Sequence, residues 1–186
     1  IEGSNCAENH PMSMKWIMRA KEKGAKIIHV DPRFTRTSKV ADIFAQIRPG
    51  TDIAFLNAII NYVLQNKLYD EQYLTEHTNA LFLVKDDFAF HEGLFSGYDP
   101  AGFKYDNSSW GYVLDEQGKP VKAESLDDPR CVFSKMKEFF RRYDLKTASS
   151  ICGIPEDTIK LIAETYAQNR PGTILYALGM TQHTVG

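Results

Sequence analysis

The chain has 186 residues, 43% of them apolar and 12% aromatic, and a formal net charge of -2. This length and apolar content allow one substantial core and exclude an intrinsically disordered protein. The charge provides no global basic field, so nonspecific nucleic-acid binding is excluded. No run of apolar residues reaches the roughly 18 that predict a membrane-spanning helix, so we expect no direct insertion into a membrane.

Both ends of the chain indicate an internal piece of a larger protein. Ile1 has the character of the last residue of a strand that is already under way, and residues 179–186, GMTQHTVG, stop where a helix is expected to begin.

The first forty residues predict a helix followed by a strand. Segment 11–23 starts with a proline, is followed by Gly24, and has helical spacing of its apolar side chains. Residues 26–32, KIIHVDP, predict a strand that ends at the Asp-Pro pair. The predicted inner face of the helix consists of Met14, Ile17, Met18 and the stem of Lys21.

A short β-prone segment, 45–49, precedes a second amphipathic helix within 50–67. We expect Thr51 or Asp52 to cap this helix with its side chain. The expected apolar stripe consists of Ile53, Leu56, Ile60, Val63 and Leu64, widened by Phe55 and Ile59.

A further short helix is expected at 69–78. Residues 79–128 lack a clean period and predict an irregular insertion with short helical and hairpin pieces. Helices are then expected at 129–143 and at 153–168, and a buried strand of the parallel-sheet type at 172–179. In the second of these helices the expected inner face consists of Ile159, Ile162, Ala163 and Tyr166.

These elements together predict an α/β fold, a Rossmann-like doubly wound domain with a mainly parallel sheet and an irregular insertion. Ligands of such sheets bind where strands turn into helices and expose backbone amides. Four clusters of small or polar residues are expected at such turns. They are Gly3-Ser4-Asn5, Asp31-Pro32-Arg33-Phe34-Thr35, Gly50-Thr51-Asp52 and Gly179-Met180-Thr181-Gln182.

In the first cluster, Gly3 and Ser4 lack bulk, so a diphosphate can approach the backbone, and the Asn5 amide can donate and accept hydrogen bonds. This cluster is not a GxGxxG motif, and the alternative is a tight turn that needs small residues for its own geometry. In the second cluster, Asp31 suits a ribose hydroxyl and Arg33 a phosphate.

Hydroxyl donors suited to phosphate oxygens accompany Asp31 and Arg33 in the second cluster. They are Thr35, Thr37 and Ser38, and Arg36 adds a second cation. The alternative is a solvated charged loop with Asp31 in a turn role.

Asp52 has two competing interpretations. Its carboxylate can accept hydrogen bonds from the N–H edge of a guanine or pterin ring, but not while it caps its own helix. The fourth cluster carries amide and hydroxyl groups, and His183 follows it. No catalytic triad is visible, because the other histidines have no nucleophile at a suitable spacing, and His29 is interpreted as a strand residue.

The cysteines offer no metal site by their spacing. Cys6, Cys131 and Cys152 lack a CxxC pair, so they cannot assemble a zinc or iron–sulfur centre by themselves. Cys131 and Cys152 can form a disulfide in an oxidising compartment, whereas isolated thiols in a domain of this size are more often reduced and partly buried.

In order, these segments resemble the third, nucleotide-binding domain of the molybdopterin oxidoreductases of the dimethyl sulfoxide reductase family. GSNCAENHP resembles the pattern G-x-N-x-x-E-x-HP, and VDPRFTRTSKVAD resembles DPR-x-T-x-TA-x-x-AD. IRPGTDIAFLNAII resembles PGTD-x-A, and YALGMTQHTVG resembles G-x-x-Q-H. The aromatic insertion and the segments DPRCVFSKMK and ICGIPEDTI are similar to the large subunits of respiratory formate dehydrogenases, often selenocysteine-containing, and not to the nitrate reductase branch.

The resemblance implies oxidation of formate to carbon dioxide at a molybdenum or tungsten ion that two molybdopterin guanine dinucleotides hold through dithiolenes. It places the metal-ligating selenocysteine or cysteine, the catalytic residues and a 4Fe-4S cluster outside this chain. It further implies an iron–sulfur electron-transfer subunit, a cytochrome as a further partner, and the bacterial periplasm, with the cytoplasm as the alternative.

Carried over by position, the resemblance assigns cofactor-binding roles to four groups of residues. Phosphates are assigned to Gly3, Ser4, Asn5 and Glu8, and ribose and phosphate to Asp31, Arg33 and Thr35. The guanine end is assigned to Gly50 and Asp52, and the pterin to Leu178, Gly179, Met180 and Gln182.

Three alternatives stay open. A nicotinamide dehydrogenase would use the same sheet but needs the glycine-rich fingerprint that is absent here. A non-catalytic scaffold of the same superfamily is expected to lose donors such as Asn5, Asp31 and Gln182, which are present. Another member of the family, acting on nitrate or a different oxo-anion, differs by residues that lie outside this chain.

Overall fold

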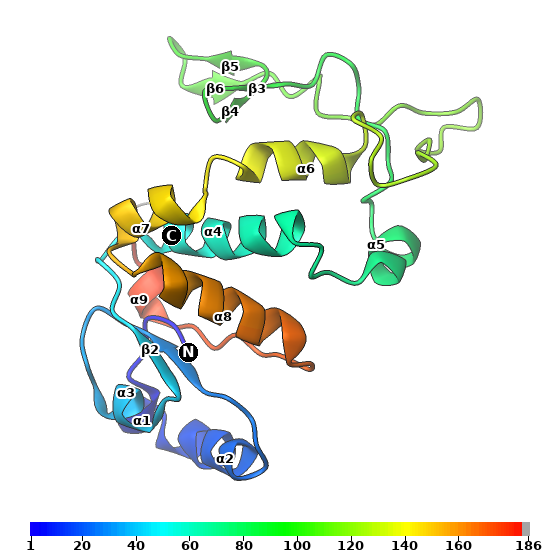
Figure 1. The fold of residues 1–186 in the computed structure, drawn as a ribbon. Helices are drawn as coiled ribbons and strands as arrows, with labels where there is room; N and C mark the ends of the chain where they lie inside the picture. Colours follow the sequence, from blue (N-terminus) through cyan, green and yellow to red (C-terminus); the bar gives the residue numbers. More distant parts are fainter. Residues whose placement is uncertain (184–186) are drawn as a thin grey trace. The chain divides into compact units, whose positions relative to one another are not determined.

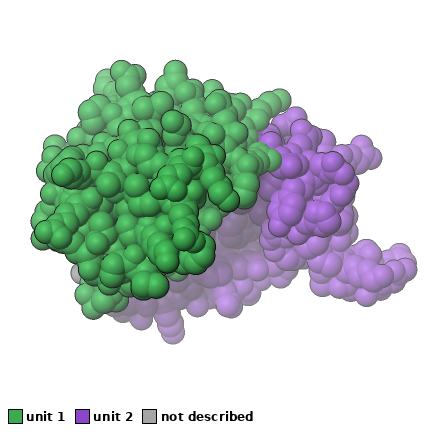
Figure 2. Space-filling model, turned by 90° about the horizontal axis from the view of Figure 1, so that it is seen from below, with its two compact units in different colours: residues 1–68, 143–186 green, residues 69–142 purple. Residues whose placement is uncertain are grey.

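The computed structural model describes residues 1–183, and the chain divides into two compact units (Figure 2). Unit 1 comprises residues 1–68 and 143–183 of the described range, and unit 2 comprises Tyr69–Arg142. Residues 184–186, which end the predicted GMTQHTVG turn, lie outside the described range. No helix in residues 1–183 has the length and apolarity needed to cross a membrane.

Short parallel pairings form the centre of unit 1. Strands β1 (Ile28–Val30) and β2 (Ile43–Ala45) pair in parallel, with Val30 opposite Ala45. Glu2 makes single parallel bridges to Val30 and to Tyr176. Four chain segments therefore run side by side in the order Tyr176, Glu2, β1, β2, but only β1 and β2 form a ladder, and the result is a mixed α/β unit with a small sheet.

Seven helices in the described part of unit 1 surround this sheet (Figure 1). They are α1 (Cys6–Asn9), α2 (Pro11–Glu22), α3 (Arg36–Val40), α4 (Asp52–Gln65), α7 (Leu145–Cys152), α8 (Glu156–Gln168) and α9 (Leu178–Thr181). Helices α2, α4 and α8 lie where the sequence predicts helices, whereas α3 between β1 and β2 was not predicted.

The two faces of β1 have different surroundings because successive side chains of a strand point to opposite sides. Val30 belongs to a core cluster with residues of α4, α7 and α8, and Ile28 packs against that cluster. His29 points to the other face, where its ring contacts Ser38 of α3. The described core cluster consists of Val30, Ala45, Ile47, Phe55, Ala58, Ala148, Cys152, Ile154, Ile159 and Ile162.

Helix α4 lies where it is predicted, but only part of its predicted stripe is buried. Phe55 and Leu64 are buried as expected, and Leu56 and Ile59 pack against the core cluster. Ile53 and Ile60 are exposed instead, and Ala58, which lies outside the predicted stripe, is buried. The sequence offers apolar residues on both faces, and contacts with α7 and α8 decide between them. The predicted side-chain cap is also wrong, because the Thr51 hydroxyl donates to the Arg48 carbonyl oxygen instead.

Three further predictions need correction. Strand β2 lies a few residues before the predicted 45–49, and the predicted buried strand at 172–179 is an exposed segment that pairs through the single bridge at Tyr176 before α9 begins. Helix α7 was not predicted, although Asp144 caps it and Gly153 ends it with a φ of 79°. Eight residues offer too few turns for a periodicity to stand out.

Unit 2 contains helices α5 (Glu71–His77) and α6 (Val132–Phe140) at the predicted places and two small hairpins. No helix lies within the described residues 79–128, so the predicted helical pieces of the insertion are absent there. Cys131 in this unit and the other two cysteines of the chain are free and buried. The strands are β3 (Phe90–His91), β4 (Leu94–Phe95), β5 (Tyr98–Asp99) and β6 (Lys104–Tyr105).

Candidate functional site

Two glycines from distant parts of unit 1 are in direct backbone contact. Gly3 has a φ of 62°, and a Cβ added to it would lie 3.1 Å from the Cα of Gly179. A Cβ added to Gly179 would overlap the carbonyl oxygen of Gly3. Neither position therefore has room for a side chain, and the first and fourth predicted clusters meet at this point.

A hollow of about 610 Å³ opens beside the two glycines. It brings together residues from all four predicted clusters, which confirms that these turns converge although they are far apart in the sequence. The predicted site residues among its lining are Gly3, Ser4, Asn5, Asp31, Arg33, Asp52, Leu178 and Gly179.

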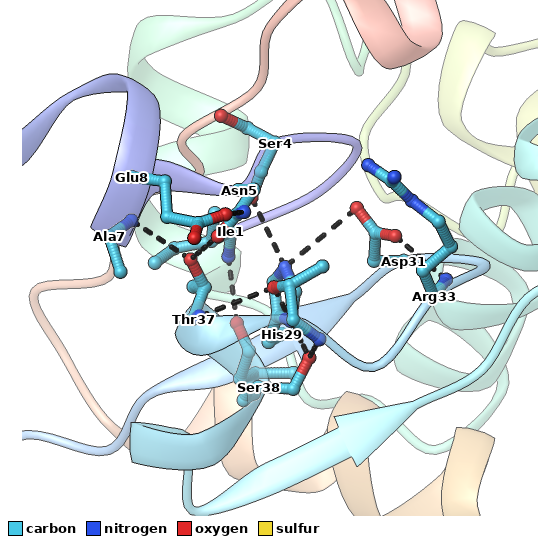
Figure 3. A network of polar contacts seen from close by, with 12 residues as sticks. Ile1, Ser4, Asn5, Ala7, Glu8, His29, Asp31, Arg33, Thr37 and Ser38 are labelled. Atoms are coloured by element: carbon cyan, nitrogen blue, oxygen red, sulfur yellow. Dashed lines mark hydrogen bonds and ion pairs between the residues drawn. The ribbon is translucent and has the colours of Figure 1, made fainter.

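Hydrogen bonds to the buried hydroxyl group of Thr37 hold the Gly3–Asn5 turn in place, as Figure 3 shows. The Thr37 hydroxyl donates to the Asn5 side-chain oxygen at 3.1 Å and accepts from the amide of Ala7 at 3.0 Å. The Asn5 side-chain nitrogen donates to Glu8. The side chain of Asn5 is therefore occupied within the turn, and its backbone is the part left to meet a ligand.

The hydroxyl groups of Thr37 and Ser38 are buried in this network, so the expectation that they bind phosphate is wrong. Thr35 caps α3 through a capping box with Ser38, which fixes the loop that follows β1. The sequence signal for this role is the Ser three residues after a Thr, at the start of a helix.

Asp31 lies at the end of β1 and is 6% exposed. One of its carboxylate oxygens accepts from the amide of Arg33 at 2.8 Å, so Asp31 also has the turn role that the sequence left open. Arg33 is exposed, lines the hollow and supplies a cation beside it. Arg36 instead pairs with Glu8 at 3.1 Å and is mostly exposed.

Asp52 is the first residue of α4, and its Oδ2 atom is buried and accepts no hydrogen bond from the described residues. Nδ1 of His183 lies 3.2 Å from this oxygen. No side-chain hydrogen bond caps α4, so the capping interpretation is wrong, and the Asp52 carboxylate instead lies against the imidazole of His183.

A second hollow of about 470 Å³ adjoins Asp52 and has mostly apolar walls, including Ile53, Leu56 and Tyr176. Glu2 lines it, is 4% exposed, and has an Oε1 atom without a hydrogen-bond partner among the described residues. Burial, reinforced by the charge of Asp52, raises the pKa of Glu2 to about 7.

Five predicted site residues do not line the larger hollow as described for residues 1–183. Gly50 and Met180 line the second hollow, whereas Glu8, Thr35 and Gln182 line neither. Gln182 instead ends α9. Their assignment to the cofactor stays a prediction.

Sequence reasoning missed several residues that line the larger hollow. Pro49 and Ile47 follow β2, Asn9 ends α1 and His10 follows it, and Tyr176 bridges to Glu2. Position relative to a strand end was a usable signal for the first two, but Tyr176 was assigned to a buried strand and therefore overlooked.

Comparison with known proteins identifies the relatives of this chain. A family model described as molybdopterin oxidoreductase matches residues 1–186. The chain is 54% identical to the formate dehydrogenase subunit alpha of Megalodesulfovibrio gigas and 50% identical to the major subunit of the nitrate-inducible formate dehydrogenase of Escherichia coli. These matches cover 99% and 100% of the chain but only 19% of each relative, so the chain spans about a fifth of their length.

A solved structure, the acetylene hydratase of Pelobacter acetylenicus, matches with a TM-score of 0.58 at 20% sequence identity. The match covers 90% of this chain and 16% of that protein, and it supports the fold. The family model matches the whole chain, and the formate dehydrogenase subunits are 50% and 54% identical to it, so both comparisons identify the same family. The chain belongs to the molybdopterin oxidoreductase family.

Proposed function

We propose that this chain is part of the catalytic subunit of a formate dehydrogenase and that it binds the guanine dinucleotide end of a molybdopterin cofactor. The observation that carries the proposal is the convergence of Gly3, Asp31, Arg33, Asp52 and Gly179 on one hollow. The identity to formate dehydrogenase alpha subunits supports the substrate, formate.

The residues present fit such a ligand on three counts. The contact of Gly3 and Gly179 leaves bare backbone where a diphosphate approaches, and Arg33 offers a planar cation that suits phosphate oxygens. The carboxylate of Asp52 lines the hollow, with Oδ2 3.2 Å from Nδ1 of His183, and carboxylate oxygens are acceptors that suit the N–H edge of guanine.

In this proposal the chain binds and orients, and the metal and its dithiolenes supply the redox chemistry that turns formate into carbon dioxide. Asp31 meets a ribose hydroxyl, Arg33 a phosphate, and Asp52 the guanine. The remaining assigned contacts along this dinucleotide are made by Glu8, Thr35, Gly50, Leu178, Met180 and Gln182.

The finer features of the proposal rest on the family likeness. They are a Rossmann-like doubly wound domain, a molybdenum or tungsten ion, two guanine dinucleotides, a selenocysteine or cysteine ligand and a 4Fe-4S cluster elsewhere in the full protein. An iron–sulfur subunit and a cytochrome are proposed partners, and one relative, from Nitratidesulfovibrio vulgaris, carries cytochrome c-553 in its name. The proposed compartment is the bacterial periplasm.

The test is Asp31→Ala in the full-length enzyme, with guanine nucleotide released by acid and bound metal both measured. Loss of a hydrogen bond to a charged group costs about 2 kcal/mol, so we expect roughly thirtyfold weaker retention of the cofactor. The control is Asp87→Ala, which removes an exposed aspartate of unit 2. Unchanged nucleotide and metal content in Asp31→Ala would contradict the binding role.

The second candidate, reduction of nitrate or another oxo-anion, has support from the family alone. Formate-dependent dye reduction by the purified full-length enzyme is expected. If the enzyme instead oxidised a reduced dye in the presence of nitrate and showed no activity with formate, it would be a nitrate reductase and not a formate dehydrogenase.

A further inference from the structure

His29 is a buried titratable group that the proposed binding contacts do not use. Its side chain is 0% exposed and lies under the Gly3–Asn5 turn (Figure 3). Nε2 lies 3.2 Å from the carbonyl oxygen of Ser4, and Nδ1 lies 2.9 Å from the hydroxyl oxygen of Ser38. Both ring nitrogens therefore have partners in segments that come from different turns.

The partners fix the proton of the ring. A carbonyl oxygen only accepts, so Nε2 carries the hydrogen and donates it to Ser4. The pKa of His29 is lowered chiefly by burial, so the ring is neutral and Nδ1 accepts from the Ser38 hydroxyl. The Ser38 oxygen in turn accepts from the amide of Thr35 at 2.8 Å. Three hydrogen bonds thus connect the cap of α3 to the Gly3–Asn5 turn.

The charged groups around the ring are compatible with this state. Oδ2 of Asp31 lies 4.0 Å from Nε2 and favours a proton there, while the amino group of Ile1 acts in the opposite direction. The ring of Phe44, in the neighbouring strand β2, lies 5.9 Å from the imidazole and adds no charge.

The bond to Ser4 sets the direction of the next amide. The peptide between Ser4 and Asn5 is planar and trans, so its N–H points away from its carbonyl oxygen. With the carbonyl directed at His29, the amide of Asn5 is directed away from the buried ring. Ser4 and Asn5 both line the larger hollow, and the Asn5 side chain is already occupied.

We infer that His29 is a positioning residue for the nucleotide: by holding the Ser4 carbonyl, it aims the backbone amide of Asn5 at a phosphate oxygen of the dinucleotide. This inference rests on the proposed function. It gives a buried histidine on a strand a role in ligand binding without any contact between the imidazole and the ligand.

The test compares His29→Phe with His29→Gln in the full-length enzyme. Phenylalanine keeps the ring shape and removes both hydrogen bonds, whereas the glutamine amide reaches the same place as Nε2 and can donate to Ser4. We expect His29→Phe to release guanine nucleotide about tenfold faster during dialysis, as about 1.4 kcal/mol of lost binding would predict, and His29→Gln to restore most of the retention.

Two further variants separate this role from simple stability. Ile28→Ala removes packing in the same strand and is expected to lower the melting temperature with little change in nucleotide release. Ser38→Ala removes the hydroxyl beneath His29 and is expected to accelerate release about threefold. If His29→Phe does not accumulate, the comparison of Ser38→Ala and His29→Gln with Ile28→Ala decides.

The outcomes distinguish the two proposals. Normal retention in His29→Phe together with loss in Asp31→Ala overturns the positioning role and leaves the binding site intact. Normal retention in all His29, Ser38 and Asp31 variants overturns the proposed function. Equal loss in His29→Phe and His29→Gln, matched by Ile28→Ala at the same melting temperature, reduces His29 to a packing residue.

Discussion

The two units of the chain hold their loops in place by different means. In unit 1 the turns are fixed by buried hydrogen bonds, with His29 and Thr37 fully buried between neighbouring turns. In unit 2 the hairpins are linked by ring contacts among partly exposed aromatic residues, such as Phe90 with Phe95 and Phe95 with Trp110.

The difference teaches where a phosphate site can form. Hydrogen bonds have direction and fix which way each backbone amide points, whereas ring contacts tolerate small rotations. Unit 1 can therefore aim backbone donors at an anion, whereas hydrogen bonds in unit 2, such as the one between the hydroxyl groups of Ser96 and Ser109, tie its own loops together. Changes to the turns at the larger hollow of unit 1 should alter ligand retention, while changes to the hairpins of unit 2 should alter stability alone.

The largest effect is expected for Gly179→Ala. The new Cβ would overlap the carbonyl oxygen of Gly3, and backbone atoms cannot move aside as the end of a flexible side chain can. We expect a loss of about 2–4 kcal/mol in the free energy of unfolding and the absence of bound guanine nucleotide in the full-length enzyme. Thermal melting and nucleotide analysis measure the two effects.

The control for this variant is Gly118→Ala in unit 2, where φ is positive but open space surrounds the added Cβ. It should lower stability by the cost of backbone strain and leave the nucleotide in place. Full retention of the nucleotide in Gly179→Ala would contradict the claim that the turns of unit 1 bind it.

An intermediate effect is expected for Glu2→Gln, and it depends on pH. Because the pKa of Glu2 is raised to about 7, the folded protein binds this proton more tightly than the unfolded chain does. The contribution is fully present below pH 4.5 and is lost as pH rises through 7. Glutamine does not titrate, so the variant should be more stable than the unchanged protein at pH 8, by at most about 3 kcal/mol, and similar at pH 5.

Chemical denaturation of the full-length enzyme at both pH values measures this difference. Glu124→Gln, at an exposed position of unit 2, is the control and should show no such pH dependence. Equal pH slopes for Glu2→Gln and the unchanged protein would show that a donor outside the described residues already satisfies the buried carboxylate.

The smallest effect is expected for Phe95→Ala in unit 2. Phe95 contacts the rings of Phe88, Phe90 and Trp110 but is 39% exposed, so its loss should cost about 1–2 kcal/mol. Nucleotide content should stay unchanged, as measured after acid release. A fall in nucleotide content would extend the binding function to unit 2 and end the contrast.

The sequence by itself determined the helices with a clear apolar period and a boundary signal. Helix α2 begins at its proline and ends before Gly24. Helix α8 buries Ile159, Ile162 and Ala163 as predicted, but Tyr166, also predicted on this face, is exposed. The sequence also located the four turns that gather at the larger hollow, because small, acidic and basic residues at strand ends carry their chemistry in their identity. The identity of the proposed ligand, a molybdopterin guanine dinucleotide, came from the resemblance to a known family.

Only the tertiary structure decided which faces and which groups are used. On helix α4, the side chain of Phe55 faces the core of unit 1 and that of Ile53 does not, because α7 and α8 lie on the side of Phe55. Thr37 holds the Asn5 side chain across 32 positions of the chain, and Gly3 meets Gly179 from near the other end. Local periodicity and turn preferences act over a few residues, whereas these contacts depend on which segments folding brings together.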